Sequence, residues 1–202
     1  CDVYMSQHKS KRFIVSVARI IVLFFIGLLI SLPSRAFWIA DGVEVAPHDL
    51  GVFLPSTEEM VSVSDSTGGV IVAWEDNRNG LNEIYVQRLS PSGHPLWDID
   101  GVRIAGIDLV HSVDNFAITT DGAGGAIIVW PDDRSTSTDI YAQRIDSTGS
   151  VMWGIGGETV CTASGTQDRP QIVSDHSGGT IITWQDERNG YHDIYAQRLN
   201  SY

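Results

Sequence analysis

The chain has 202 residues, of which 20 are glycine and 7 proline, and its formal net charge is −12. This length suffices for one domain with a core of its own, and the abundance of glycine favours a turn-rich β protein. After residue 36 the chain carries eight arginines, no lysine and 24 acids. So acidic a body repels phosphate backbones, which excludes nucleic-acid binding.

The first 36 residues have the layout of a secretory signal peptide. Three basic residues open the segment, an apolar run spans 20–32, and Ser34 and Ala36 stand at positions −3 and −1 of a cleavage site. Met5 has the place of an initiator, so residues 1–4 are interpreted as upstream read-through. We therefore predict a protein that is secreted, extracellular or periplasmic, and that meets the membrane only during export.

An uncleaved membrane anchor is the alternative for this segment. Residues 13–32 are long enough to span a bilayer, but Arg19 interrupts the apolar run.

Cys161 remains without an intramolecular disulfide partner if Cys1 precedes the true start, and we interpret it as a small core residue.

The rest of the chain, 37–202, is a repeat. Three similar stretches begin at Ser64, Thr120 and Ser174 and share the pattern Asp…Gly-Gly…Trp-x-Asp-x-Arg…Tyr-x-Gln-Arg. Their equivalent tryptophans, Trp74, Trp130 and Trp184, are 56 and 54 residues apart. A second tryptophan recurs in "WIADGVEVA", "WDIDGVRIA" and "WGIGGETVC", beginning at Trp38, Trp97 and Trp153. We divide the domain into repeats at approximately 38–96, 97–152 and 153–202.

Each repeat predicts four short antiparallel strands. Segments such as "TIITW" are rich in β-branched residues, and "DIYAQRL" places Ile194 and Tyr195 on opposite sides of a strand. The Gly-Gly pairs mark tight turns in which the preceding Asp accepts backbone N–H bonds. Four strands every 54 to 59 residues without helices predict an all-β fold of β-propeller-like blades. A string of small sandwiches is less favoured, because 55 residues are too few for a sandwich core.

Three blades are fewer than the usual minimum of four in a closed propeller. The segment from Trp38 to Ala46 matches the fourth strand of a blade, whereas the last repeat stops after its third strand. We therefore predict either a fragment of a larger propeller or an assembly of copies. Open blade edges favour self-association.

With its W-x-D-x-R and DIYAQR motifs, the chain resembles secreted bacterial repeat proteins that are treated as β-propeller-like. The resemblance covers about residues 38–202 and implies the architecture rather than an activity. A looser similarity, to sialidase and Asp-box propellers, is carried by "SDSTGG", which keeps the acid and glycine of their turn motif but displaces its tryptophan.

The Asp-x-Arg pairs are the candidate binding residues, and they lie at the loop that follows the second strand of each blade. A ring of acids and arginines could grip carboxylates or sugars through bidentate contacts. Alternatively, each pair closes its own turn, and its presence in every blade favours this structural role. The residues are Asp76, Arg78, Asp132, Arg134, Asp186 and Arg188. Arg88, Arg144 and Arg198 are expected to brace neighbouring blades.

A specific function should lie where the repeats differ. The variable loops 47–59, 106–115 and 164–169 add His48 and His111 as candidate binding residues, beside acids that include Asp168. No nucleophile elbow, zinc-protease motif, phosphate loop or complete calcium loop occurs, so we predict no cofactor or metal.

We therefore expect a secreted or cell-surface, non-catalytic repeat domain that binds a glycan or protein or serves as a scaffold. The alternative is a fragment of a sialidase-like glycoside hydrolase whose catalytic blades lie outside this chain.

Overall fold

The computed structural model describes residues 42–45, 59–76, 78–80, 82–105 and 115–200. The chain divides into two compact units, Cys1–Ala36 and Phe37–Tyr202, and every described residue belongs to the second. In the part of the chain that the structure describes, no helix is long and apolar enough to cross a membrane. The predicted signal peptide, and the anchor that is its alternative, lie outside the described residues.

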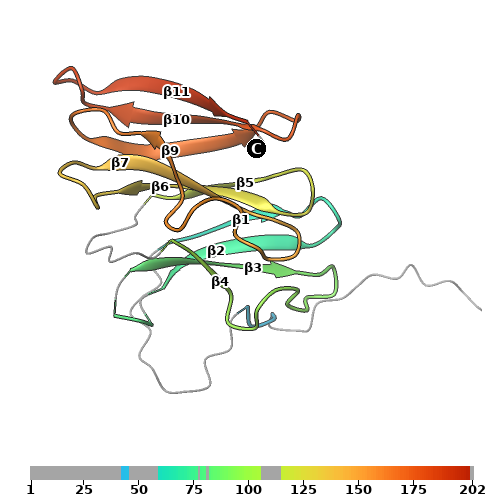
Figure 1. Cartoon of the computed structure of the whole chain (residues 1–202). Coiled ribbons are helices and arrows are strands. Elements are labelled where there is room, and N and C mark those ends of the chain that lie inside the picture. The colour runs from blue at the N-terminus through green and yellow to red at the C-terminus, as the bar shows by residue number, and fades with distance from the viewer. Residues whose placement is uncertain (1–41, 46–58, 77, 81, 106–114, 201–202) are drawn as a thin grey trace, which may run out of the picture. The chain divides into compact units, whose positions relative to one another are not determined.

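Eleven strands in the described residues form three antiparallel sheets (Figure 1). The first sheet contains, in this order, β1 (Met60–Ser64), β2 (Val70–Asp76), β3 (Glu83–Leu89) and β4 (Val102–Ala105). The second contains β5 (Ala117–Thr120), β6 (Ala126–Asp132), β7 (Asp139–Ile145) and β8 (Glu158–Cys161). The third has the order β11–β10–β9, with β9 (Gln167–Ser174), β10 (Thr180–Asp186) and β11 (Asp193–Leu199). The prediction of an all-β fold of propeller-like blades is confirmed, and in the described residues the first two sheets have the predicted four strands.

The fourth strand of a sheet comes from the segment that the second tryptophan opens. After Trp97 the chain turns through Gly101 into β4, which pairs with β3. β8 follows Trp153 in the same way and pairs with β7. The first and second sheets therefore each span parts of two sequence repeats, since the repeats were divided at that tryptophan, whereas the strands of the third sheet all lie within 153–202.

The Asp–Gly-Gly turns connect the first two strands of each sheet as the sequence predicts. In the first sheet, Asp65 Oδ1 accepts hydrogen bonds from the backbone N–H groups of Thr67 and Gly69, at 2.8 and 2.7 Å. Asp121 and Asp175 accept the equivalent bonds in the other two sheets. The short Asp side chain therefore holds the same turn three times.

Every sheet has two distinct faces, because side chains alternate along a strand. The aliphatic face of the first sheet consists of Ile71, Ala73, Ile84 and Val86; of the second, Ile127, Val129, Ile140 and Ala142; and of the third, Ile181, Thr183, Ile194 and Ala196. The opposite, Trp–Tyr face contains Trp74 and Tyr85, Trp130 and Tyr141, or Trp184 and Tyr195.

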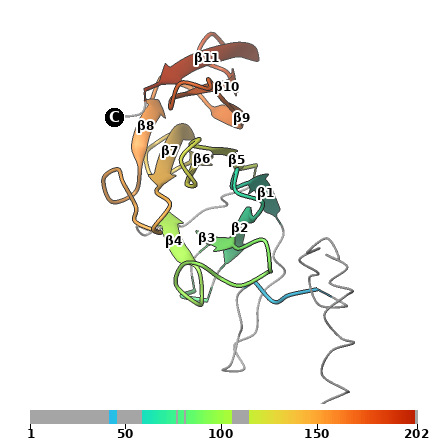
Figure 2. The same cartoon turned by 90° about the vertical axis from the view of Figure 1, so that its right-hand side faces the viewer.

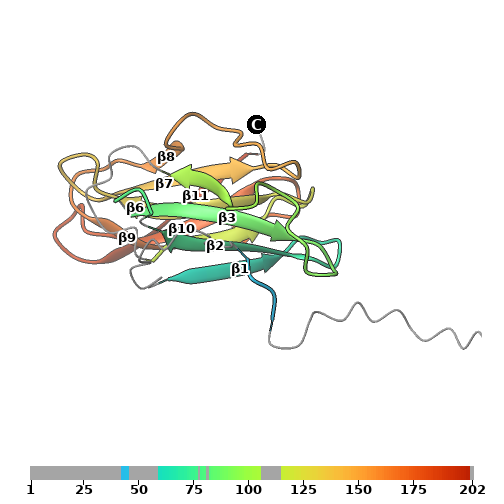
Figure 3. The ribbon, with the colours of Figure 1, turned by 90° about the horizontal axis from the view of Figure 1, so that it is seen from below.

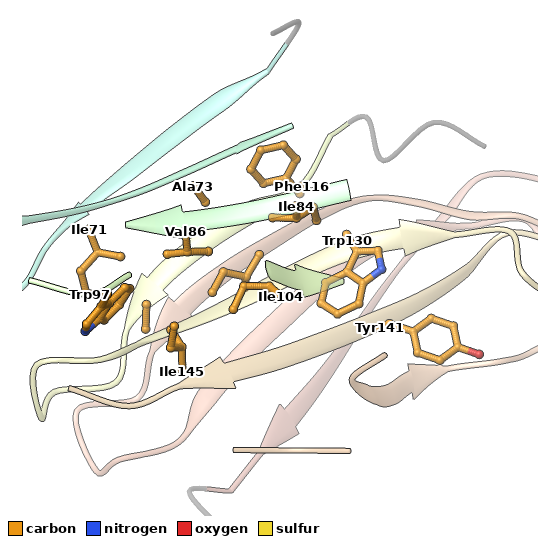
Figure 4. Close-up of a cluster of buried hydrophobic side chains, with 12 residues drawn as sticks. Ile71, Ala73, Ile84, Val86, Trp97, Ile104, Phe116, Trp130, Tyr141 and Ile145 are labelled. Carbon is orange, nitrogen blue, oxygen red and sulfur yellow. The ribbon is translucent and has the colours of Figure 1, made fainter. Parts of the chain in front are cut away.

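The core forms where the aliphatic face of one sheet meets the Trp–Tyr face of the next. Ile71, Ile84 and Val86 of the first sheet share a buried cluster with Trp130 and Tyr141 of the second (Figure 4). The aliphatic face of the second sheet packs in the same way against Trp184 and Tyr195 of the third. Figure 2 shows the sheets one above another in chain order, from β1–β4 at the bottom to β9–β11 at the top, and in Figure 3, seen from below, they overlap. The tryptophans and tyrosines of the second and third sheets therefore pack between sheets.

The three brace arginines act first within their own sheets. Arg88 pairs with Asp65, Arg144 with Asp121 and Arg198 with Asp175, so each locks the Gly-Gly turn of its blade. Arg88 also reaches the second sheet, where its Nη1 donates to Ser147 O at 3.3 Å. The predicted bracing between blades is thus found for Arg88, in addition to a local role that the sequence analysis did not anticipate.

Candidate functional site

The Asp-x-Arg motif has the same geometry in all three sheets. In the second, Asp132 Oδ2 accepts a 3.0 Å hydrogen bond from Trp130 Nε1, and Oδ1 accepts a 2.9 Å bond from the Arg134 backbone N–H. The Arg134 guanidinium forms an ion pair with the same carboxylate and lies 4.0 Å from the centroid of the Tyr141 ring. The first and third sheets repeat these contacts at Asp76–Arg78 and Asp186–Arg188.

These three carboxylates are withdrawn from solvent. The side chains of Asp76, Asp132 and Asp186 are 0% exposed, whereas those of their arginines are partly exposed. Burial by itself raises the pKa of Asp132, but the bonds from Arg134 and Trp130 outweigh it and hold the pKa below its usual range. The geometry therefore supports the structural role, since each carboxylate is already saturated by donors of its own blade. A direct role of the six residues in binding stays a prediction.

The guanidinium groups are not free to converge on a common ligand. Arg78 and Arg134 each also donate to a backbone carbonyl of the segment that leads into the fourth strand, Asp100 O and Gly156 O, both at 3.0 Å. Arg188 donates to Cys161 Sγ at 3.2 Å. Cys161, expected in the core, is half-buried beside this ion pair.

Two cavities lie at the loop end of the second and third sheets, where the repeats differ in sequence. The first, of about 570 Å³, is lined by Thr166, Asp168, Arg169, Gln185, Glu187 and His192. The second, of about 730 Å³, is lined by Asp133, the run Ser135–Thr138, Ser164, Gly165 and Thr166. Thr166 lines both, and we call the pair the loop-end cavities.

The variable loop 164–169 lines both loop-end cavities, as expected of a loop that differs between repeats. Arg169 has φ +52°, in the left-handed region that non-glycine residues rarely adopt. Next to it, the β9–β10 pairing shifts register between Thr183 and Gln185. This bulge is typical of strands that direct side chains toward a site.

The ionisable groups of the first cavity are mutually paired and accessible. His192 Nε2 lies 3.1 Å from Glu187 Oε1, and Arg169 Nε lies 4.0 Å from Asp168 Oδ2. These side chains are 39 to 67% exposed, so a ligand can compete for them. The second cavity presents hydroxyl groups, which both donate and accept hydrogen bonds.

Sequence reasoning missed part of this site. It compared the loops that precede the first strand but not the β6–β7 loop, where Ser135–Thr138 replaces the Asn-Gly of Asn79 and Asn189. This departure from the repeat was the available signal. The other candidate residues, His48 and His111, lie outside the described residues.

Comparisons with known proteins identify no family. No family model and no curated protein matches the chain. One solved structure, the endo-arabinase from Bacteroides thetaiotaomicron VPI-5482, is similar with a TM-score of 0.39 and 15% sequence identity over 69% of this chain. The chain spans about half of that structure, 55% of its length. The assignment of blades therefore rests on the strands, their order and their packing.

The buried carboxylates predict a loss of stability in acid. The pKa of Asp65 is lowered to about 2, because the hydrogen bonds from Thr67, Arg88 and Gly69 outweigh burial, and the pKa values of Asp76, Asp132 and Asp186 are also lowered. A depressed pKa stabilises the fold above the unfolded value of about 3.9, and this contribution is lost as the pH falls through the folded value. We expect the melting temperature to fall steadily from about pH 5 to pH 2.

Protonation of the many surface carboxylates in acid also relieves their mutual repulsion, and this effect by itself raises the melting temperature. Thermal unfolding followed by circular dichroism at low and high salt separates the two, because salt screens exposed charges more than buried pairs. A melting temperature that rises or stays constant on acidification to pH 2.5 would contradict the prediction.

Proposed function

We propose that this protein is an exported, non-catalytic repeat domain that binds a glycan at the loop-end cavities of its second and third sheets. The observation that carries the proposal is that the repeated residues bond within their own sheets, whereas the variable residues leave polar groups accessible. The Asp-x-Arg motifs repeat the same carboxylate contacts, and their hydrogen-bonding groups are satisfied within each sheet, whereas accessible polar groups gather where the repeats differ.

The chemistry of the cavity walls supports a sugar ligand. Hydroxyl groups from Ser135–Thr138 and carboxylates such as Asp168 can pair with the hydroxyl groups of a sugar, each of which donates and accepts. Tyr191, next to His192, is exposed and offers an aromatic surface for stacking. A concave site with a few placed polar groups is the usual form of a binding site for a small ligand.

Nothing in the described residues favours the sialidase-like alternative. That alternative places its catalytic blades outside this chain, and Arg78, Arg134 and Arg188, which each lie over the tyrosine of their own sheet, are not positioned as its converging arginines. The resemblance to secreted repeat proteins and the signal-peptide pattern support the exported location.

Glycan-array binding of the full chain tests the proposal. We expect the wild type to bind at least one glycan, and Asp168→Asn to weaken that binding about tenfold, as loss of one charged hydrogen bond costs about 1.4 kcal/mol. Asp98→Asn is the control, because Asp98 is also exposed but lies outside both cavities. Failure to bind any glycan, or hydrolysis of the bound one, would refute the proposal.

A further inference from the structure

The third sheet is exposed where the other two are covered. Its aliphatic-face residues Ile181 and Ile194 are 40 and 72% exposed, although their equivalents in the first and second sheets, Ile71, Ile84, Ile127 and Ile140, are 0 to 1% exposed. Val173, which pairs with Ile181 on the same face, is 58% exposed. In the described residues no sheet covers this face.

The same sheet has three strands in the described residues, and its glutamine marks the place of a fourth. Gln87 and Gln143 are fully buried, because each binds the segment that enters the fourth strand. Gln143 Nε2 donates to Gly154 O and its Oε1 accepts from Trp153 N, both at 3.0 Å. The equivalent Gln197 is exposed, and the described part of the chain offers it no such bond.

Gly42 has the backbone conformation of the glycines that lead into the fourth strands of the first and second sheets. Gly42 has φ +96°, as Gly101 and Gly157 have +82° and +84° at the equivalent positions of "DGVEVA", "DGVRIA" and "GGETVC". A Cβ at Gly101 would lie 2.6 Å from Trp74 Cη2, and one at Gly157 2.7 Å from Trp130 Cη2. At Gly42 the same position is empty within 4 Å. Gly42 thus has the positive φ of its equivalents, but in the described residues no indole contacts it.

Val45 already occupies the position of a fourth-strand residue against the next sheet. Its equivalents Ile104 and Val160 lie in the clusters around Trp130 and Trp184, respectively. Val45 packs in the same manner against Trp74 and Tyr85 of the first sheet. Residues 42–45 therefore lie where the last strand of a preceding blade would lie, and the described residues contain no other strand of such a blade.

We propose that two copies of this chain complete each other. Residues 42–45 of one copy add to β11 of the other as the fourth strand of its third sheet, whose aliphatic face then covers the Trp–Tyr face of the first sheet. Both contacts repeat packing that the chain already shows between its own sheets. A twofold axis repeats these contacts at both ends of the pair, so that three sheets from each copy form six blades. This number lies within the four to eight blades of known propellers.

A face-to-face dimer of two third sheets explains less. It would cover Ile181 and Ile194, but it would leave Gln197 without the strand segment that its equivalents bind and Gly42 without an indole. The proposed dimer, in which each copy supplies a strand to the other, accounts for all four of these residues with one arrangement.

The strand register of the proposed contact follows from the repeat. In the second sheet Tyr141 is opposite Thr159 and Ala142 is opposite Glu158. The equivalent pairs across two copies are Tyr195 with Glu44 and Ala196 with Val43. Side chains directly opposite on an antiparallel pair are close enough for a disulfide.

Analytical ultracentrifugation of the full chain is the first test. We expect a dimer for the wild type and a monomer for Ile194→Glu, whose dimer dissociation constant should rise at least 100-fold. Ile155→Glu is the matched control and should remain dimeric, because Ile155 is 88% exposed and lies outside both faces. A monomeric wild type, a trimer or larger assembly, or a dimer that Ile194→Glu leaves intact would overturn the proposal.

Oxidative cross-linking tests the arrangement itself. The double variant Val43→Cys/Ala196→Cys should give a covalent dimer on a non-reducing gel, whereas either single substitution should leave the chain uncross-linked. An intramolecular bridge in the double variant would show that one copy closes on itself, and the absence of any bridge would contradict the register. Both outcomes overturn the proposal, and neither depends on the ligand of the loop-end cavities.

Discussion

Asp132→Ala is expected to lower the free energy of unfolding by about 3 kcal/mol. The Asp132 carboxylate is fully buried and accepts from Trp130 Nε1, from the Arg134 backbone N–H and from the Arg134 guanidinium. Its removal leaves the indole N–H and a partly buried cation without their partner, and removal of one member costs more than such a pair contributes. Urea denaturation followed by tryptophan fluorescence measures the change.

Two further variants test whether the loss of stability in Asp132→Ala comes from the repeated ion pair. Asp98→Ala removes an exposed carboxylate and should change stability by no more than about 0.5 kcal/mol. Asp186→Ala should cost about as much as Asp132→Ala, since the third sheet has the same contacts. If Asp132→Ala abolished glycan binding and left stability unchanged, the motif would be a binding site and the structural role would be wrong.

Much of the blade was predictable because its determinants are local. A strand of alternating apolar residues, an Asp–Gly-Gly turn and a Trp-x-Asp-x-Arg motif each act within a few residues, and their repetition separates scaffold from site. The comparison of Asp76, Asp132 and Asp186 alone favoured an internal ion pair, which the structure shows in every sheet.

The remaining features depend on residues that are distant in sequence. The second loop-end cavity combines Asp133 and Ser135–Thr138 with Ser164–Thr166, which approach only when the second and third sheets stack. The burial of Ile84 and the exposure of the equivalent Ile194 depend likewise on whether a neighbouring sheet is present. No local pattern distinguishes these two isoleucines, because both precede the same Tyr-x-Gln-Arg sequence.

Gly125→Ala tests whether the turn between β5 and β6 has any freedom to relax. A Cβ at this position would lie 2.2 Å from Ile145 O and 2.8 Å from Asp121 Oδ2. The carbonyl belongs to the neighbouring strand β7 and cannot move without disturbing the sheet. We expect the substitution to lower the free energy of unfolding by about 3 kcal/mol.

The damage should extend beyond the turn, because Asp121 connects it to β7. Asp121 accepts from Gly125 N at 2.8 Å and holds the guanidinium of Arg144 at 3.0 Å, so a displaced carboxylate weakens both contacts. Gly154→Ala is the control: nothing lies within 4 Å of its Cβ position, and its φ is not positive. There the smaller entropy of the unfolded chain should leave stability unchanged or raise it by up to about 1 kcal/mol. The two substitutions add the same methyl group, so opposite signs of the change in urea midpoint would locate the cost in the contact with β7, whereas equal effects would show that the turn yields.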